Sequence, residues 1–186
     1  MIQENPINNS TDCLPVIKYG ESILRTKART VKDFTIIPEI VSSMYETMRY
    51  ENGIGLAANQ VGWDLNLLII DTRNHDDENG YNQIIINAKI IHSEGEIIME
   101  EGCLSIPNIR AEIKRPETII IKFQNIDQKY YEQKYAGITS RAIQHEIDHL
   151  NGKLFIDYLP QAKRMLIKKR LLEISKTGNP SSGIIL

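Results

Sequence analysis

The stretch 145–149, His-Glu-Ile-Asp-His, constrains this chain more than any other part of its sequence. On an α-helix, His145 and His149 lie one turn apart on the same face, where both can bind one metal ion, and Glu146 stands beside them. A catalytic metal usually takes three protein ligands and keeps one position open for water. The motif therefore predicts a helix that carries two ligands of a hydrolytic metal site, and it requires a third ligand from elsewhere.

The residues around the motif predict a buried helix. Ile143, Ile147 and Leu150 recur along one side of it, whereas the two histidines lie with Ile138 and Ala142 on nearly the opposite side. A helix that is apolar on two sides is typical of a position between two layers. We therefore expect this helix at the centre of the domain.

Cys103 is the best candidate for the third ligand. It lies in the stretch Met-Glu-Glu-Gly-Cys-Leu-Ser-Ile-Pro, where Gly102 permits an unusual backbone and Pro107 is expected to halt the following segment. A cysteine thiolate is a donor that Zn²⁺ and Fe²⁺ accept readily. The alternative ligand is Glu173, which would make the protein an ordinary zinc endopeptidase. Glu173 stands among leucines and basic residues, where an ion pair in solvent suits it better.

A purely structural metal is an alternative from another class of protein. Such a site is closed by a fourth protein ligand, and Cys13 is the only other cysteine of the chain. Cys13 ends the polar, Asn-rich segment 1–13, which we expect to be flexible, and this speaks against that reading. With only two cysteines we expect no disulfide, and a reducing cytoplasm as the location.

Composition and periodicity predict a single α+β domain spanning residues 1–186. The hydrophobic fraction is 41% and the net charge is −2, so no global basic field would attract nucleic acid. No apolar run is long enough to cross a membrane. We expect mostly antiparallel strands wrapped around the central metal-binding helix, with one N-terminal and one C-terminal helix. The expected strands are 66–71, 84–91, 95–99, 118–124 and 129–135. Three helices are expected: the first follows Pro38, the second begins near Thr139 or Ser140, and the third follows Pro160. The tail 178–186 is expected to be flexible.

The segment 53–62, Gly-Ile-Gly-Leu-Ala-Ala-Asn-Gln-Val-Gly, is rich in small residues. It is a poor phosphate loop because no Gly-Lys-Ser/Thr follows it. It does place the amide of Gln60 in a tight segment, and an amide N–H is the kind of donor that stabilises an oxyanion.

Three motifs taken together resemble the peptide deformylase family. They are Gly-Ile-Gly-Leu-Ala-Ala-Asn-Gln at 53–60, Glu-Gly-Cys-Leu-Ser at 101–105 and Gln-His-Glu-Ile-Asp-His-Leu-Asn-Gly at 144–152. Each motif is weak alone, but all three in this order are highly specific, and the resemblance extends over residues 15–160. It implies a hydrolase that removes the formyl group from the N-terminal formyl-methionine of new polypeptides and releases formate.

The resemblance also implies a role for each matching residue. The metal ligands would be Cys103, His145 and His149, the general acid/base Glu146, and the oxyanion donors Gln60 and the backbone N–H of Leu104. The substrate would contact Ile54, Gly55, Arg110, Ile138 and Arg141. The cofactor would be one divalent ion per chain, usually Fe²⁺ in the cell, with Zn²⁺, Ni²⁺ or Co²⁺ able to replace it.

Further expectations come from the resemblance. Arg141 replaces an apolar pocket residue of some relatives, and we expect its stem to line the pocket while its guanidinium reaches water. Asp148 would pair with Arg115 as a structural support. The basic side of the C-terminal helix would contact ribosomal RNA, with a simple solvated face as the alternative. Its basic residues are Lys163, Arg164, Lys168, Lys169, Arg170 and Lys176.

Overall fold

The computed structural model describes residues 13–73, 80–178 and 184–185 of the chain. The α-helices are α1 (Ile37–Tyr50), α2 (Gly137–Leu150) and α3 (Gln161–Thr177). The strands are β1 (Gly55–Ala57), β2 (Leu67–Asp71), β3 (Asn82–Glu94), β4 (Ile97–Cys103), β5 (Ile106–Arg115), β6 (Thr118–Gln124), β7 (Tyr130–Ala136) and β8 (Ile184–Ile185). Three short 3-10 helices are η1 (Ser22–Arg25), η2 (Ala58–Val61) and η3 (Phe155–Tyr158).

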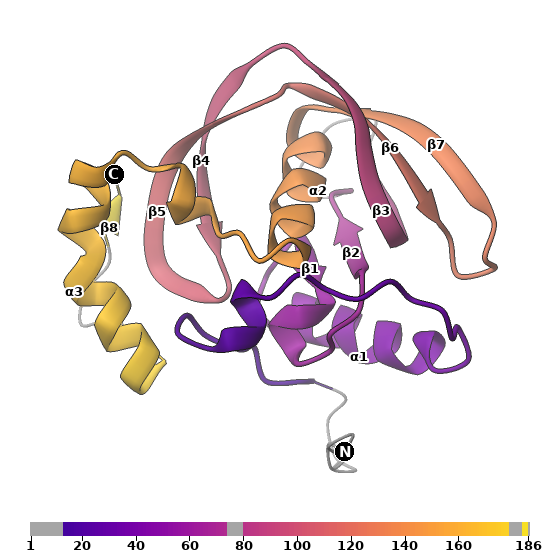
Figure 1. Cartoon of the computed structure of the whole chain (residues 1–186), viewed down its shortest axis with the longest axis horizontal. Coiled ribbons are helices and arrows are strands. Elements are labelled where there is room, and N and C mark those ends of the chain that lie inside the picture. The colour runs from indigo at the N-terminus through magenta and orange to yellow at the C-terminus, as the bar shows by residue number, and fades with distance from the viewer. Residues whose placement is uncertain (1–12, 74–79, 179–183, 186) are drawn as a thin grey trace.

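The strands form two sheets around α2 (Figure 1). The larger sheet has the order β1-β2-β3-β6-β7, and each pair of neighbours is antiparallel. The smaller sheet has the order β4-β5-β8, with β4 antiparallel and β8 parallel to β5. The architecture is α+β, and it confirms the prediction of mostly antiparallel strands around a central helix.

The helix α2 is buried, as its sequence predicts. Ile143, Ile147 and Leu150 belong to one hydrophobic core, in which they meet residues of the larger sheet. Those sheet residues include Leu68, Ile70, Ile85, Ile119 and Ile121. Ten of the fourteen residues of α2 are buried, so this helix provides a rigid platform for the side chains on its other side.

The strand β2 is apolar on both faces because helices cover both. Leu68 and Ile70 face the core around α2, whereas Leu67 and Ile69 belong to a second core with α1. The alternation follows from the two-residue period of a strand. On α1, Ile40, Met44 and Met48 form an apolar face, and all three are buried.

A third core joins β5 to the C-terminal part of the chain. Ile109, Ala111 and Ile113 of β5 lie in one cluster with Ile167 and Leu171 of α3. Figure 1 shows α3 at the outer edge of the molecule, beside β5 and β8. The C-terminal helix predicted after Pro160 is therefore confirmed, and it covers the smaller sheet.

The start of α2 differs from the prediction. The helix begins at Gly137, whose φ of 56° turns the chain, and not at Thr139 or Ser140. Neither hydroxyl caps the helix, because both point to other partners in the interior. The Thr139 hydroxyl lies 2.8 Å from that of Thr72, and Ser140 Oγ accepts a hydrogen bond of 2.9 Å from Gln144.

The prediction that Pro107 halts its segment is wrong. Pro107 lies inside β5, at a register shift where Gly102 pairs with Arg110 but the next residue, Cys103, pairs with Ile106. A proline is tolerated at such a bulge because no ladder hydrogen bond is needed from its nitrogen. β4 ends at Cys103, where the two-residue turn 104–105 leads into β5.

The two chain ends are only partly described. Most of the segments 1–13 and 178–186, expected to be flexible, lies outside the described residues. Of the described part, Gly178 ends α3 with a φ of 79°, and Ile184–Ile185 pair with β5 as β8. Within the described ranges, no helix combines the length and the apolar character needed to cross a bilayer.

Candidate active site

Cys103, His145 and His149 bring one ligand atom each to a single place. Their ligand atoms all lie within 4.8 Å of one another, although the cysteine ends β4 and both histidines belong to α2. The sulfur Sγ is 3.1 Å from His149 Nε2. The arrangement predicted from the sequence is therefore present, and it depends on the contact between the smaller sheet and α2.

These three side chains fit a divalent metal. One thiolate and two imidazoles form a donor set suited to Zn²⁺ or Fe²⁺. Burial lowers the pKa of His149 well below its usual value, so its ring is neutral and able to act as a ligand. Among the described residues, the group that could hold a metal contains neither Glu173 nor Cys13. No fourth protein ligand therefore closes the site within the described part of the chain.

The carboxylate of Glu101 orients His145. Its Oε2 lies 3.0 Å from His145 Nδ1, which leaves Nε2 of the ring for a metal. Arg115 bonds both oxygens of Glu101 and also donates to Asp148 over 2.7 Å, so the predicted Asp148–Arg115 pair is confirmed. Burial would raise the pKa of Glu101, but hydrogen bonds from His145 and Arg115 outweigh it and lower the pKa to about 2. Glu101 is thus a fixed anion behind the ligand ring.

The guanidinium of Arg141 lies in the interior and not in water, contrary to the expectation. Only 3% of the residue is exposed. Arg141 Nη1 donates to Glu101 and to the carbonyl oxygen of Ile113, and Nη2 donates to that of Ile97 over 2.8 Å. The residue still lines the cavity described below. Glu101 draws the charged group inward because the buried carboxylate needs compensation.

Glu146 lies beside the two histidines with one oxygen free. Only 4% of the residue is exposed, and Oε2 has no partner among the described residues. Burial raises the pKa of Glu146 to about 7, which matches a group that exchanges protons near neutral pH. A Cβ on Gly55 would stand 2.7 Å from Glu146 Oε1. The glycine is therefore needed for the close approach of this carboxylate.

The amide of Gln60 is held in one orientation. Its Oε1 accepts a hydrogen bond of 2.9 Å from the N–H of Ala57. Its Nε2 then donates to Ser105 Oγ over 3.2 Å and lies 3.7 Å from Cys103 Sγ. The amide nitrogen consequently faces the sulfur of Cys103 on one side and the hydroxyl of Ser105 on the other.

A cavity of about 790 Å³ opens beside these groups. Its wall includes every residue predicted to touch the substrate, together with the catalytic candidates and two of the three ligands. They are Ile54, Gly55, Gln60, Cys103, Leu104, Arg110, Ile138, Arg141, His145 and Glu146. His149 lies deeper, with 1% exposed. Arg110 has 61% of its side chain exposed and pairs with Glu100 at the rim.

Sequence reasoning missed two residues that shape the centre, Glu101 and Ser105. Both belong to the motif at 101–105, but only Cys103 was given a chemical role there. The available signal was an acidic residue inside an apolar strand two positions before the ligand, because a carboxylate in such a place needs a buried cation. The residues that supply the cations, Arg115 and Arg141, are far from it in sequence, so their pairing was not visible.

Fold and site together define a metal-dependent hydrolase. Comparison with known proteins agrees, since the model of the family described as polypeptide deformylase matches residues 13–165. The chain therefore belongs to the polypeptide deformylase family. It is 43% identical over 170 residues to the peptide deformylase of Buchnera aphidicola subsp. Acyrthosiphon pisum (strain Tuc7), covering 91% of this chain and 96% of that protein.

Solved structures show the same fold. The crystal structure of a peptide deformylase from Legionella pneumophila superimposes with a TM-score of 0.80 at 34% identity, over 89% of this chain and 97% of that one. That of peptide deformylase from Thermus thermophilus gives a TM-score of 0.81 at 34% identity, over 88% and 98%. The chain is accordingly a deformylase, a hydrolase that acts on the N-formyl group of new polypeptides.

Proposed function

We propose that deformylation takes place at the centre formed by Cys103, His145 and His149. The observation that carries this proposal is the three-ligand group with no fourth protein ligand in the described part of the chain, next to a buried carboxylate and an oriented amide. A catalytic metal site is open on one side in this way, whereas a structural one is closed. The substrate would be a formyl-methionyl peptide, and the products formate and a free amino terminus.

Fe²⁺ is the metal that we propose for the cell, held by the one sulfur and two nitrogen ligands. A divalent metal in such a site lowers the pKa of a bound water from about 15.7 to about 7 and polarises a carbonyl group. The fixed charge of Glu101 would keep the His145 ring in the tautomer that can act as a ligand. Burial around His149 would keep that ring neutral.

Glu146 would act first as general base and then as general acid. Its free oxygen Oε2 would take the proton of the attacking water and later deliver it to the departing amine nitrogen. A pKa of about 7 supports both halves of this cycle. Gly55 supports it sterically, because the carboxylate reaches its place only next to a residue without a side chain.

Gln60 and the backbone N–H of Leu104 would stabilise the negative charge on the oxygen of the tetrahedral intermediate. The amide orientation fixed by Ala57 supports this role for Gln60, because the donor needs no rearrangement during the reaction. Removal of one such donor typically costs about 3–4 kcal/mol of barrier.

The methionine side chain would occupy the apolar part of the cavity. Ile54 and Ile138 line it, together with Arg141, whose charged end is turned away into the interior. The inward guanidinium supports an apolar pocket, since only the aliphatic stem then remains for the substrate. A formyl carbon bears only hydrogen, so we expect it to reach the crowded centre where an acetyl methyl group would clash.

Formate release from a formyl-methionyl peptide tests the proposed function. The reaction is run anaerobically with Fe²⁺ or Zn²⁺, and the matched acetyl-methionyl peptide serves as the control. We expect formate from the first peptide and no product from the second. Cleavage of an unformylated internal peptide bond would instead support an endopeptidase.

The ligand assignment is tested by elemental analysis of two cysteine variants. Cys103→Ala should lose the metal because only two ligands remain. Cys13→Ser is the matched control and should keep it, since Cys13 lies outside the ligand group. Metal loss in Cys13→Ser would favour a closed structural site, and full metal content in Cys103→Ala would reject the sulfur as a ligand.

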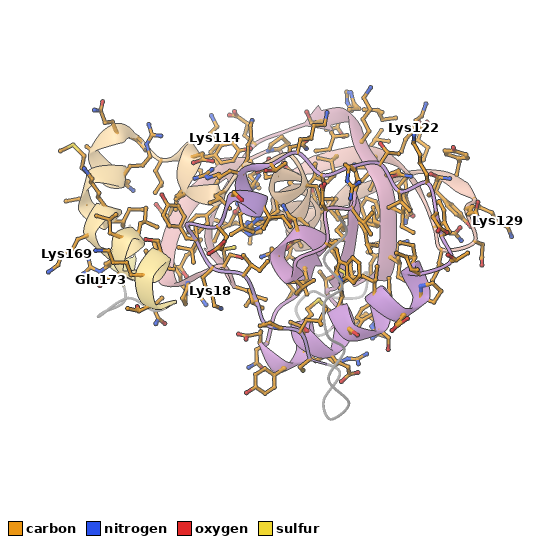
Figure 2. All side chains as sticks on the ribbon, turned by 60° about the horizontal axis from the view of Figure 1, so that its bottom comes forward. Lys18, Lys114, Lys122, Lys129, Lys169 and Glu173 are labelled. Carbon is orange, nitrogen blue, oxygen red and sulfur yellow. The ribbon has the colours of Figure 1, made fainter. Side chains whose placement is uncertain are left out.

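The basic side of α3 would contact ribosomal RNA in the cytoplasm, where formylated chains emerge. Exposed Arg164, Lys168 and Lys169 lie on the helix at the outer edge of the molecule, as the label of Lys169 shows in Figure 2. Co-sedimentation with ribosomes should weaken when these three residues become alanine. The matched control changes three exposed lysines of the β6–β7 hairpin, Lys122, Lys129 and Lys134, to alanine. Equal loss in both variants would mean only nonspecific attraction by charge.

A further inference from the structure

Residues 17–19 bind the two separate segments that carry the oxyanion donors. The N–H of Ile17 donates to the carbonyl oxygen of Gln60 over 2.7 Å, and the N–H of Tyr19 donates to that of Ser105 over 2.9 Å. Gln60 belongs to η2 and Ser105 to the turn between β4 and β5. This short N-terminal segment therefore connects both halves of the oxyanion site through its backbone.

The residue between these two contacts, Lys18, adds a third through its side chain. Lys18 Nζ donates to the carbonyl oxygen of Leu104 over 2.9 Å, across 86 residues of sequence. An ammonium group makes a stronger hydrogen bond to a carbonyl than a neutral donor does. Lys18 is half-buried and lines the same cavity as Gln60 and Glu146.

Leu104 is thus held on two sides. Its side chain packs on the core around α1, where a Cβ on Gly53 would stand 3.0 Å from Leu104 Cδ1. Its carbonyl oxygen is held by Lys18. The side-chain contact orients the Cα–Cβ bond of Leu104, and the carbonyl contact limits its ψ. Together they limit where the preceding planar peptide, which carries the Leu104 N–H, can lie.

Lys18 also differs in its partner from the arginines that line the cavity. Arg110 pairs with Glu100 and Arg141 with Glu101. Among the described residues, Lys18 forms no ion pair with a carboxylate. Its ammonium group donates to a neutral carbonyl oxygen. Its positive charge is therefore not neutralised next to a space where an anion forms.

We propose that Lys18 is a positioning residue for deformylation, which holds Leu104 so that the N–H of this residue meets the developing oxyanion. This inference rests on the proposed function. The backbone bonds of Ile17 and Tyr19 keep the segment in place, and the side chain of Lys18 sets the turn that follows Cys103.

Three variants test the proposal. Lys18→Met removes the donor and the charge but keeps the length of the side chain, Lys18→Arg restores both, and Lys129→Met is the matched control. Lys129 is exposed and lies on the opposite side of the molecule in Figure 2. For each protein, kcat and KM are measured on one formyl-methionyl peptide, and metal content by elemental analysis. The ¹⁵N shift of the Ser105 amide is recorded without substrate, because this amide shares a peptide group with the Leu104 carbonyl.

We expect kcat of Lys18→Met to fall about tenfold or more, since small displacements of aligned groups cost up to about a hundredfold. Its KM should change less than about twofold and its metal content should match wild type. The Ser105 shift should move in Lys18→Met and return in Lys18→Arg, whereas Lys129→Met should behave as wild type.

Wild-type kcat in Lys18→Met, or an unmoved Ser105 shift, would overturn the proposal. Loss of metal in Lys18→Met would also overturn it, because the residue would then support the ligands and not the donors. An inactive wild-type protein would count against the proposed function alone, since the Ser105 shift reports the Lys18 contact without any turnover.

Discussion

The surroundings of the two buried carboxylates of the site, Glu101 and Glu146, shift their pKa values in opposite directions. Glu101 meets Arg115 and His145, and its pKa is lowered to about 2. Glu146 is also buried but its burial dominates, and its pKa is raised to about 7. Glu101 therefore stays ionised near neutral pH beside His145, whereas Glu146 can exchange a proton there.

Replacement of Glu146 by glutamine tests the second of these roles. The amide keeps the size of the side chain but cannot accept the proton of water. We expect kcat to fall by about 10²–10⁴-fold, the usual contribution of a general acid/base. Steady-state kinetics check this, with elemental analysis to show that the metal stays. Undiminished turnover would refute the role.

The pH dependence of stability tests the first role. Because the folded pKa of Glu101 is lowered, its ionisation stabilises the folded state above about pH 4.5, and this contribution is lost as the pH falls toward 2. In the metal-free protein at pH 7, Glu101→Gln should lower the free energy of unfolding by about 3 kcal/mol. Urea titrations should show the two proteins converging below pH 4.5. A constant difference down to pH 2 would contradict this.

At the scale of secondary-structure elements, the sequence predicted helices better than strands. The helix α2 was visible because its apolar residues and histidines follow one helical period. The strand β5 was missed because Pro107 suggested a break, although residues 109–115 alternate buried and exposed in the period of a strand. The bulge that accommodates Pro107 depends on pairing with β4, and a single sequence does not show which strands pair.

Arg141 provides much of the contact between α2 and the β4–β5 hairpin. Its guanidinium joins the helix to Glu101, Ile97 and Ile113 on both strands of the hairpin. Arg141→Leu leaves these buried acceptors without their donor, so we expect a loss of roughly 3 kcal/mol in the free energy of unfolding. Urea denaturation measures it. Arg141→Lys should recover part of the loss, because the charge returns without the planar fork; an unchanged midpoint in Arg141→Leu would contradict the prediction.

At the scale of the whole molecule, the sequence predicted which side chains meet at the candidate site but not what holds them. The motifs were sufficient to predict that Cys103 meets the two histidines, because cysteine and histidine are typical metal ligands. Contacts such as that of Lys18 with Leu104 connect residues of no distinctive type over long separations. They depend on how the sheets, α2 and the N-terminal segment pack, so local patterns do not reveal them.

The third core makes α3 an integral part of the domain. Ile167 is fully buried against β5, whereas the neighbouring Leu166 is 63% exposed. Ile167→Ala should therefore lower the free energy of unfolding by about 2–4 kcal/mol, and Leu166→Ala should change it by less than about 0.5 kcal/mol. Urea denaturation of the pair distinguishes a packed helix from a loosely attached one. Equal effects of the two substitutions would show that α3 does not dock as described.

Cys103 belongs to the smaller sheet, whereas the two histidines stand on the helix beneath the larger one. An ion bound by all three side chains would join the smaller sheet to α2 and the larger sheet, much as a covalent cross-link does. Oxygen would break this link by oxidising the sulfur of Cys103, since a thiolate is readily converted to sulfenic and higher acids. Ageing in air should therefore lower the melting temperature in step with the activity, and a reductant that reverses the first oxidation, added together with the metal ion, should restore both.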